Sequence, residues 1–335
     1  MSVSKFDLVI SGGRVMDPES NTDAVLNVGV KDGKIAAVTA DAIQGAETID
    51  ASGHVVCPGF VDGHSHVVDI PLAQKAQLRD GVTTTLDLEV GAFPVPHWYD
   101  NLKGRSQTNY GANVSVLAAR TAAFHEDYLK QTGDLVSKTG NIVTDMSTGV
   151  PIGAEWTNKV PNADELKVIL GVVEEGLEQG ALGIGPPAGY MVDGFTSQEV
   201  KGLAKLAGKF GRFMHVHTRF SSQLPPTTGI LAIEEQLAAT ATYGGGLIIA
   251  HMTAQTLNLS MAACELIDDA RAHGVKVIAE IYPYTFGASG NGISADYLRP
   301  ENYQRNMGRT YSDIIDIQTR KRLDKETYDY LIKND

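Results

Sequence analysis

The spacing of apolar residues divides the chain into two regions. Up to residue 57, apolar and polar residues alternate, as at Phe6 and Leu8. This period of two is typical of strands that bury one face. The dipeptide Asp32-Gly33 between two such runs predicts a tight hairpin turn. We therefore expect a small, sandwich-like β domain over residues 1–57.

From residue 58 to 335, short apolar runs alternate with amphipathic segments, which predicts a parallel sheet with right-handed helical crossovers. Asn162 with Glu165 three residues later, and Thr196 with Glu199, are typical helix starts. Ser260 is expected to cap a third helix. The predicted strands lie at residues 59–62, 82–88, 113–117, 181–184, 213–216, 246–250 and 275–281.

Composition narrows the classes of function. The 335 residues are 43% hydrophobic and 20% charged, as in ordinary globular proteins. The 28 basic and 40 acidic residues give a net charge of −12, which argues against nucleic acid or an anionic membrane as a partner. Two cysteines, Cys57 and Cys264, cannot form a disulfide framework. With no apparent secretory signal and no apolar run long enough to span a membrane, we expect a cytoplasmic protein.

The sharpest chemical signal is the apolar run from Pro58 that ends in His64-Ser65-His66. Alternate residues of a strand point to the same side, so both imidazoles would face one site. Two imidazoles at the carboxyl end of a strand suit a divalent metal such as zinc. An unrelated pair of histidines in a surface turn is the alternative, which the preceding apolar run and Asp62 make less favourable.

Two further histidines end predicted strands, His217 and His251. Single histidines at strand ends are commonly structural, but four at the same end of successive strands indicate the rim where barrel active sites lie. His215 competes with His217, because it lies two residues earlier on the same face.

Glu89 closes the strand at residues 82–88 and reaches the same rim. Two metal ions about 3.5–4 Å apart need an anionic bridge, which Glu89 could supply. A solvated loop carboxylate is the alternative. Asp87 lies on the same face but deeper, which favours a core or supporting role.

Because of these residues and the motifs given below, the chain resembles the amidohydrolase superfamily, and more closely its N-acyl-D-amino-acid deacylase (D-aminoacylase) branch. The matching segments follow the order of that family along nearly the whole chain. They are residues 6–13, 58–66, 81–84, 180–184, 217–219, 250–252 and 282–284.

The resemblance implies a (β/α)8 TIM-like metal-dependent hydrolase barrel with a small N-terminal β domain, and cleavage of a small-molecule amide by metal-activated water. It implies one or two zinc ions, with His64 and His66 on one and His217 and His251 on the other. Glu89 falls near the position where D-aminoacylases have a cysteine ligand, which is a departure from the family.

For the substrate, the resemblance points to the region of Tyr282 and Ser289, which corresponds to the part that holds the substrate carboxylate. The family's lysine after the sixth-strand histidine is Thr253 here. We expect Arg219 to compensate for the missing cation.

The family's general base is an aspartate on the eighth strand. Only seven barrel strands can be identified up to Asp335, and no residue replaces that aspartate convincingly, so the catalytic base is unassigned and the barrel is expected to be incomplete at its carboxyl-terminal side. A homo-oligomer or a complementary C-terminal chain would supply the last strand and cover exposed strand edges.

Two alternatives remain open. A cyclic-amide hydrolase of the hydantoinase or dihydropyrimidinase type would use the same scaffold, although the fourth strand at residues 181–184 lacks the lysine typical of those enzymes. A catalytically silent scaffold subunit would explain the missing aspartate but not the retained histidines.

Overall fold

The computed structural model describes residues 5–125, 155–287 and 298–334, without the side chains of residues 301, 302 and 306. The chain forms two compact units, Met1–Phe60 and Val61–Asp335. The sequence pattern places this boundary slightly earlier, between residues 57 and 58. Each unit is described by itself.

The first unit is a mixed sheet in the order β3-β2-β1-β4, with β5 also paired to β1. Its strands are β1 (Phe6–Asp17), β2 (Thr22–Lys31), β3 (Lys34–Thr39), β4 (Gly45–Asp50) and β5 (Val55–Val56). Asp32 and Gly33 join β2 to β3 with φ values of 51° and 72°. Two successive residues with positive φ form the hairpin turn that Asp-Gly favours, as predicted.

In the described part of the second unit, seven strands lie in the order β12-β11-β10-β9-β8-β7-β6, which confirms the predicted TIM-like α/β architecture. From β7 to β12, each strand pairs in parallel with its neighbour. The strands are β6 (Phe60–Asp62), β7 (Val82–Ala92), β8 (Asn109–Ser115), β9 (Gly183–Gly185), β10 (Phe213–Val216), β11 (Gly246–Ile249) and β12 (Val277–Ala279).

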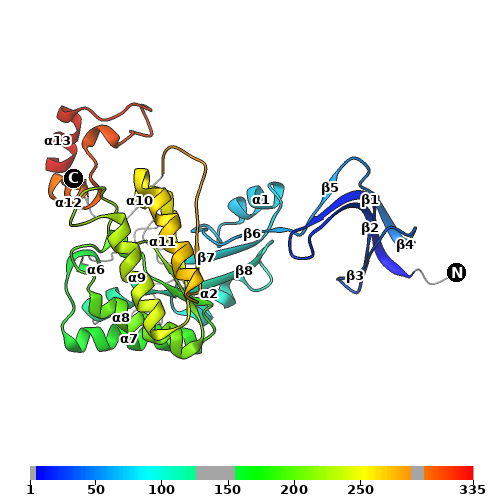
Figure 1. Cartoon of the computed structure of the whole chain (residues 1–335), viewed down its shortest axis with the longest axis horizontal. Coiled ribbons are helices and arrows are strands. Elements are labelled where there is room, and N and C mark those ends of the chain that lie inside the picture. Colours follow the sequence, from blue (N-terminus) through cyan, green and yellow to red (C-terminus); the bar gives the residue numbers. More distant parts are fainter. Residues whose placement is uncertain (1–4, 126–154, 288–297, 335) are drawn as a thin grey trace. The chain divides into compact units, whose positions relative to one another are not determined.

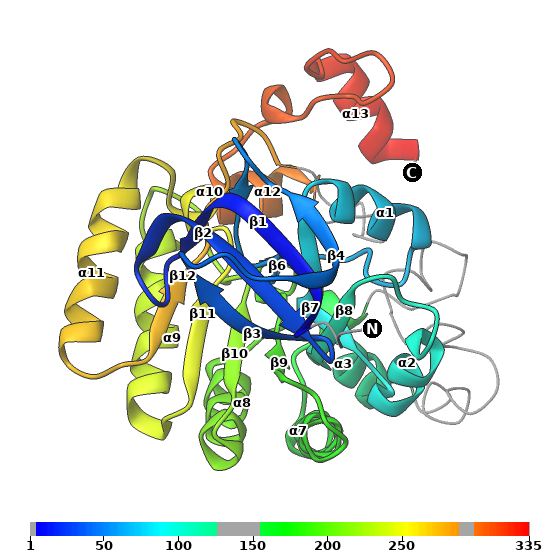
Figure 2. The same ribbon diagram turned by 90° about the vertical axis from the view of Figure 1, so that its right-hand side faces the viewer.

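Helices follow the strands in alternation and cover the outer side of this sheet (Figure 1). In Figure 2, α7, α8, α9 and α11 lie side by side along it. The helices are α1 (Pro71–Arg79), α2 (Val95–Leu102), α3 (Val116–Phe124), α6 (Glu155–Asn158), α7 (Ala163–Glu178), α8 (Ser197–Phe210), α9 (Gly229–Tyr243), α10 (Met252–Thr256), α11 (Ser260–Ala272), α12 (Pro300–Met307) and α13 (Lys325–Asn334). Short 3-10 turns lie at Ala188–Tyr190, Leu257–Leu259 and Tyr311–Asp313.

The main core lies between the sheet and these helices. Ile169 and Val173 of α7 and Leu203 of α8 are buried against strand residues such as Ile184 and Met214. This packing buries the apolar stripe that the helical spacing predicts. Among the described residues, none of the helices combines the length and apolar character that crossing a bilayer requires.

Two of the three predicted helix starts are confirmed. Asn162 and Thr196 each accept a hydrogen bond from the backbone N–H of the glutamate three residues later, and that glutamate returns to the cap backbone. The prediction for Ser260 is wrong. It is the first residue of α11, and its hydroxyl donates to the Leu257 carbonyl because a 3-10 turn leads directly into the helix.

Strand β7 extends past its predicted end at Leu88 and contains a bulge. Its pairing with β8 shifts between Asp87 and Ala92, and Gly91 has a φ of 73°. A Cβ on Gly91 would lie 2.4 Å from the Asn113 carbonyl oxygen, so only glycine fits. The bulge contains Glu89, and Asn113 fixes it by donating to the Leu88 carbonyl at 2.6 Å.

Candidate metal centre

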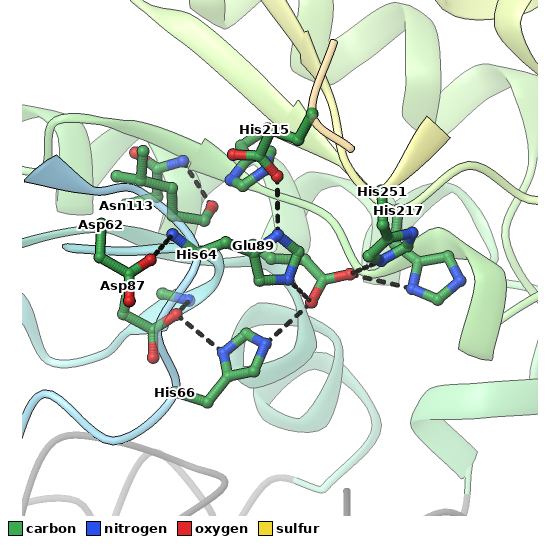
Figure 3. A network of polar contacts seen from close by, with 12 residues as sticks. Asp62, His64, His66, Asp87, Glu89, Asn113, His215, His217 and His251 are labelled. Atoms are coloured by element: carbon green, nitrogen blue, oxygen red, sulfur yellow. Dashed lines mark hydrogen bonds and ion pairs between the residues drawn. The ribbon is translucent and has the colours of Figure 1, made fainter. Parts of the chain in front are cut away.

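Polar side chains from four strands converge at the carboxyl edge of the seven-stranded sheet (Figure 3). His64 and His66 follow β6, and Glu89 lies in the bulge of β7. His217 and His251 come directly after or shortly after β10 and β11. The structure thus brings together all five residues expected to bind metal.

Glu89 is the centre of this cluster. Its Oε2 lies 3.0 Å from Nε2 of His64 and 2.9 Å from Nε2 of His66. Its Oε1 lies 2.9 Å from Nδ1 of His217 and 3.2 Å from Nε2 of His251. Each carboxylate oxygen of Glu89 therefore contacts one pair of histidines. The Glu89 side chain is only 3% exposed. A carboxylate placed between two pairs of imidazoles in this way could serve as the anionic bridge of a site with two metal ions.

The outward nitrogens of the same histidines meet a second layer of polar groups. Nδ1 of His64 lies 2.7 Å from Glu280, and Nδ1 of His66 lies 3.3 Å from Asp87. The other pair shares one partner, since the Gln255 amide lies 3.1 Å from Nε2 of His217 and 3.2 Å from Nδ1 of His251. Such partners orient metal-binding histidines and fix their tautomers. Asp87 therefore lies where the supporting role expected of it requires.

The structure separates the competing candidates on β10. His217 reaches Glu89, whereas His215 is fully buried and its Nε2 lies 2.9 Å from Glu280. The two histidines are two residues apart, so their side chains lie on the same side of the sheet, but they contact different carboxylates.

Local backbone features hold the histidines in place. The Asp62 carboxylate accepts the His64 backbone N–H at 3.0 Å, which shapes the turn after β6. A Cβ on Gly189 would lie 2.2 Å from Cδ2 of His217, so the imidazole packs directly on bare backbone. His251 has a φ of 31°, a left-handed conformation that is costly for a residue other than glycine and is typical of functional sites.

The surroundings raise the pKa values of His64 and His66 and lower the pKa of His217. Burial alone would lower the pKa of His64, but its hydrogen bonds to Glu280 and Glu89 outweigh this and raise the pKa to about 9. The pKa of His66 is also raised despite burial, through Asp87 and Glu89. Burial and the nearby His251 instead lower the pKa of His217 to about 4.

The pKa values of the two glutamates, Glu89 and Glu280, are both lowered. Burial would raise the pKa of Glu89, yet its four histidine partners lower the pKa well below the ordinary value. Burial likewise opposes ionisation of Glu280, and the hydrogen bonds from His215 and His64 lower its pKa to about 2.

The donor set fits divalent metal ions. Two groups, His64–His66–Glu89 and Glu89–His217–His251, each place their ligand atoms within 4.8 Å of one another. Imidazole nitrogen and carboxylate oxygen are common ligands for zinc and related ions. A third group of the same kind comprises His64, His215 and Glu280.

The residues expected to bind substrate have other surroundings. Arg219 contacts Glu235 at 2.9 and 2.5 Å and the Phe195 carbonyl at 2.7 Å, so its guanidinium is part of an ion pair with α9. Tyr282 stacks on Tyr284 after β12. Ser289 lies outside the described residues. A role for these three residues in substrate binding stays a prediction.

Sequence reasoning missed Glu280 and Gln255. Glu280 is a charged residue within the apolar run at residues 275–281, and that signal could have identified it. Gln255 lies on α10, which gives no local sign that its amide turns back to two histidines.

Comparison with known sequences finds amidohydrolases among the proteins similar to this chain. The chain is 25% identical over 304 residues to a dihydroorotase of Trichlorobacter lovleyi, covering 86% of this chain and 63% of that protein. It is 28% identical over 295 residues to an N-acyl-D-glutamate deacylase of Alcaligenes xylosoxydans xylosoxydans, covering 84% of this chain and 57% of that protein. The chain thus spans about six-tenths of the length of these relatives. No family profile matches it.

Comparison with solved structures also finds deacylases among the proteins with a similar fold. The N-acyl-D-glutamate deacylase from Bordetella bronchiseptica, complexed with zinc and a phosphonate inhibitor, matches with a TM-score of 0.64 at 25% identity, over 84% of this chain and 59% of that one. A D-aminoacylase described as defining a novel subset of amidohydrolases matches with a TM-score of 0.63 at 21% identity, again over 84% and 59%. The resemblance to the D-aminoacylase branch of the amidohydrolases is confirmed.

Proposed function

We propose that this chain, with the fold of the amidohydrolases it resembles, is a zinc-dependent hydrolase of amide bonds in small molecules. The observation that carries the proposal is the Glu89 carboxylate, each of whose oxygens meets two imidazole nitrogens at 2.9–3.2 Å. This arrangement offers two adjacent sets of ligands with a shared anionic bridge.

In this proposal His64 and His66 would hold one zinc ion, His217 and His251 would hold the other, and Glu89 would serve both. When bound, zinc activates water and polarises a carbonyl at neutral pH. Asp87, Glu280 and Gln255 keep the four imidazoles oriented. The aspartate expected from an eighth strand would accept and return the proton.

N-acyl-D-amino acids are the first class of substrate, because deacylases match 84% of this chain in sequence and in structure, the latter with a TM-score of 0.64. The second candidate is a cyclic amide, which the similarity to dihydroorotases supports. Against the second candidate, β9 (Gly183–Gly185) carries no lysine, and Glu89 provides the bridging carboxylate instead.

A further strand would complete the sheet. Among the described residues, β6 and β12 stand at the two ends of the strand order, and apolar side chains are exposed on both, Val61 at 63% and Ile278 at 52%. We propose that a strand from a second copy or a complementary chain pairs here. Static light scattering of the purified protein, alone and with candidate C-terminal partners, tests for such an assembly.

The decisive experiment measures amine release from matched N-acetyl-D- and N-acetyl-L-amino acids, and ring opening of dihydroorotate and hydantoin, with and without zinc. We expect zinc-dependent amine release that favours the D series. Ring opening alone would support the cyclic-amide candidate. Tight zinc binding with no turnover on either class, also in the completed assembly, would support a silent scaffold.

A paired variant tests the site itself. His64→Asn with His66→Asn should remove zinc and turnover together, while His97→Gln, at an exposed histidine of α2, should change neither. Unchanged zinc content and turnover in the paired variant would exclude this site.

A further inference from the structure

Glu280 is held firmly at the rim although it lies outside the expected ligand set. It follows β12 directly, where its backbone N–H donates to the Ile249 carbonyl at 2.9 Å and its carbonyl accepts from Met252 at 2.8 Å. Its Oε2 lies 2.7 Å from Nδ1 of His64 and 2.9 Å from Nε2 of His215. The carboxylate thus sits between two imidazoles from different strands.

His64 uses its two ring nitrogens toward two different carboxylates. Nε2 lies 3.0 Å from Glu89, on the side where four imidazoles gather, and Nδ1 points to Glu280. A neutral imidazole has one lone pair to give, so a ring that binds a metal through Nε2 must carry its hydrogen on Nδ1. Glu280 is placed to accept that hydrogen.

His215 fixes Glu280 in turn. Its ring is fully buried, and its Nδ1 has no hydrogen-bond partner in the described part of the chain. The hydrogen bond from Nε2 to Glu280 is therefore the polar contact that holds this imidazole. A buried histidine with this single partner serves to orient the carboxylate.

We propose that Glu280, anchored by His215, is a positioning residue for the metal centre: it accepts the Nδ1 hydrogen of His64 and aims Nε2 at the metal position shared with His66 and Glu89. The proposal rests on the proposed metal centre. It also implies that His64, His215 and Glu280 do not hold an ion of their own, because the single lone pair of His64 is used on the other side.

The test is Glu280→Gln, which keeps the size of the side chain and replaces the ionised acceptor by a neutral amide. Stepwise zinc binding is measured by competition with a chromophoric chelator, and the Co²⁺ protein is examined by visible absorption. We expect unchanged stoichiometry, one binding step weakened by about 10–100-fold, and an altered Co²⁺ spectrum. Glu265→Gln, at an exposed position of α11, should match the wild type.

His215→Gln provides a second test, since it removes the anchor but leaves Glu280, and it should weaken the same step by a smaller factor. Melting temperatures of the metal-free variants separate folding effects: a merely structural role would lower them and leave zinc affinity unchanged.

Three results would overturn the proposal: unchanged zinc affinity in Glu280→Gln, weakening confined to the step assigned to His217 and His251, or complete loss of one ion. The last would make Glu280 a ligand. Failure of the proposed function looks different, since the wild type itself would then bind no zinc.

Discussion

The two halves of the candidate metal centre share one carboxylate but have different surroundings. In the half formed by His64 and His66, the outward nitrogens face the carboxylates Glu280 and Asp87. In the half formed by His217 and His251, both outward nitrogens face one neutral amide, that of Gln255. The carboxylates around the first half raise the pKa values of His64 and His66, whereas burial and His251 lower the pKa of His217. Similar ligands therefore differ in how strongly protons compete with a metal.

The largest expected effect comes from Glu89→Gln, because it removes the charge common to both halves. We expect amine release to fall to the background rate and zinc content to drop in both halves, measured by elemental analysis of dialysed protein. Retention of one full zinc ion with normal affinity would show that one half is independent of Glu89.

Gly189→Ala should damage the second half selectively. The new Cβ would lie 2.2 Å from the His217 ring, so the ring must shift. A displacement of about 1 Å can cost about 10²-fold in rate, and we expect a loss of this size in kcat/KM.

Gly171→Ala on α7 is the matched control, because nothing lies within 4 Å of its added Cβ. It should keep full activity and gain up to about 1 kcal/mol in the free energy of unfolding. Equal losses in the two variants would argue against crowding of His217 as the cause.

Gln255→Glu makes the second half resemble the first. The Gln255 amide nitrogen can only donate to the outward ring nitrogens, whereas a carboxylate would accept their hydrogens. Zinc affinity of one binding step should therefore rise by about tenfold, measured by chelator competition. Gln255→Leu should lower it. Weaker binding in the glutamate variant would mean that charge at this position does not explain the difference between the halves.

The smallest effect concerns the metal-free protein. The pKa of His64 is raised from 6.5 to about 9, so the stability it contributes is complete below pH 6.5 and is lost as the pH rises through about 9. The pKa of His217 is lowered to about 4, so its contribution is lost as the pH falls from 6.5 toward 4.

Melting temperatures between pH 4 and pH 10, measured with a chelator present, should therefore decline on both sides. The alkaline decline should flatten in His64→Gln, and the acid decline should become smaller in His217→Gln. Alkaline slopes that are identical in the wild type and His64→Gln would contradict the assignment.

The sequence pattern predicts the seven strands and the meeting of the four histidines because both depend on local periodicity and on where apolar runs end. It places Asp32-Gly33 and two capping boxes correctly for the same reason. Side-chain contacts between residues distant in sequence cannot be predicted from local periodicity. The pairing of Arg219 with Glu235 of α9, and the contact of Gln255 with His217, both depend on how separate elements pack in three dimensions.

The contact between His64 and Glu280 has a mechanical consequence. These residues follow β6 and β12, the first and last strands of the seven-stranded order, yet their side chains are 2.7 Å apart. The same imidazole thus belongs to the candidate metal centre and links the two end strands of the sheet. A change at this residue would alter both the proposed metal centre and the link between β6 and β12, so neither property could be changed without the other.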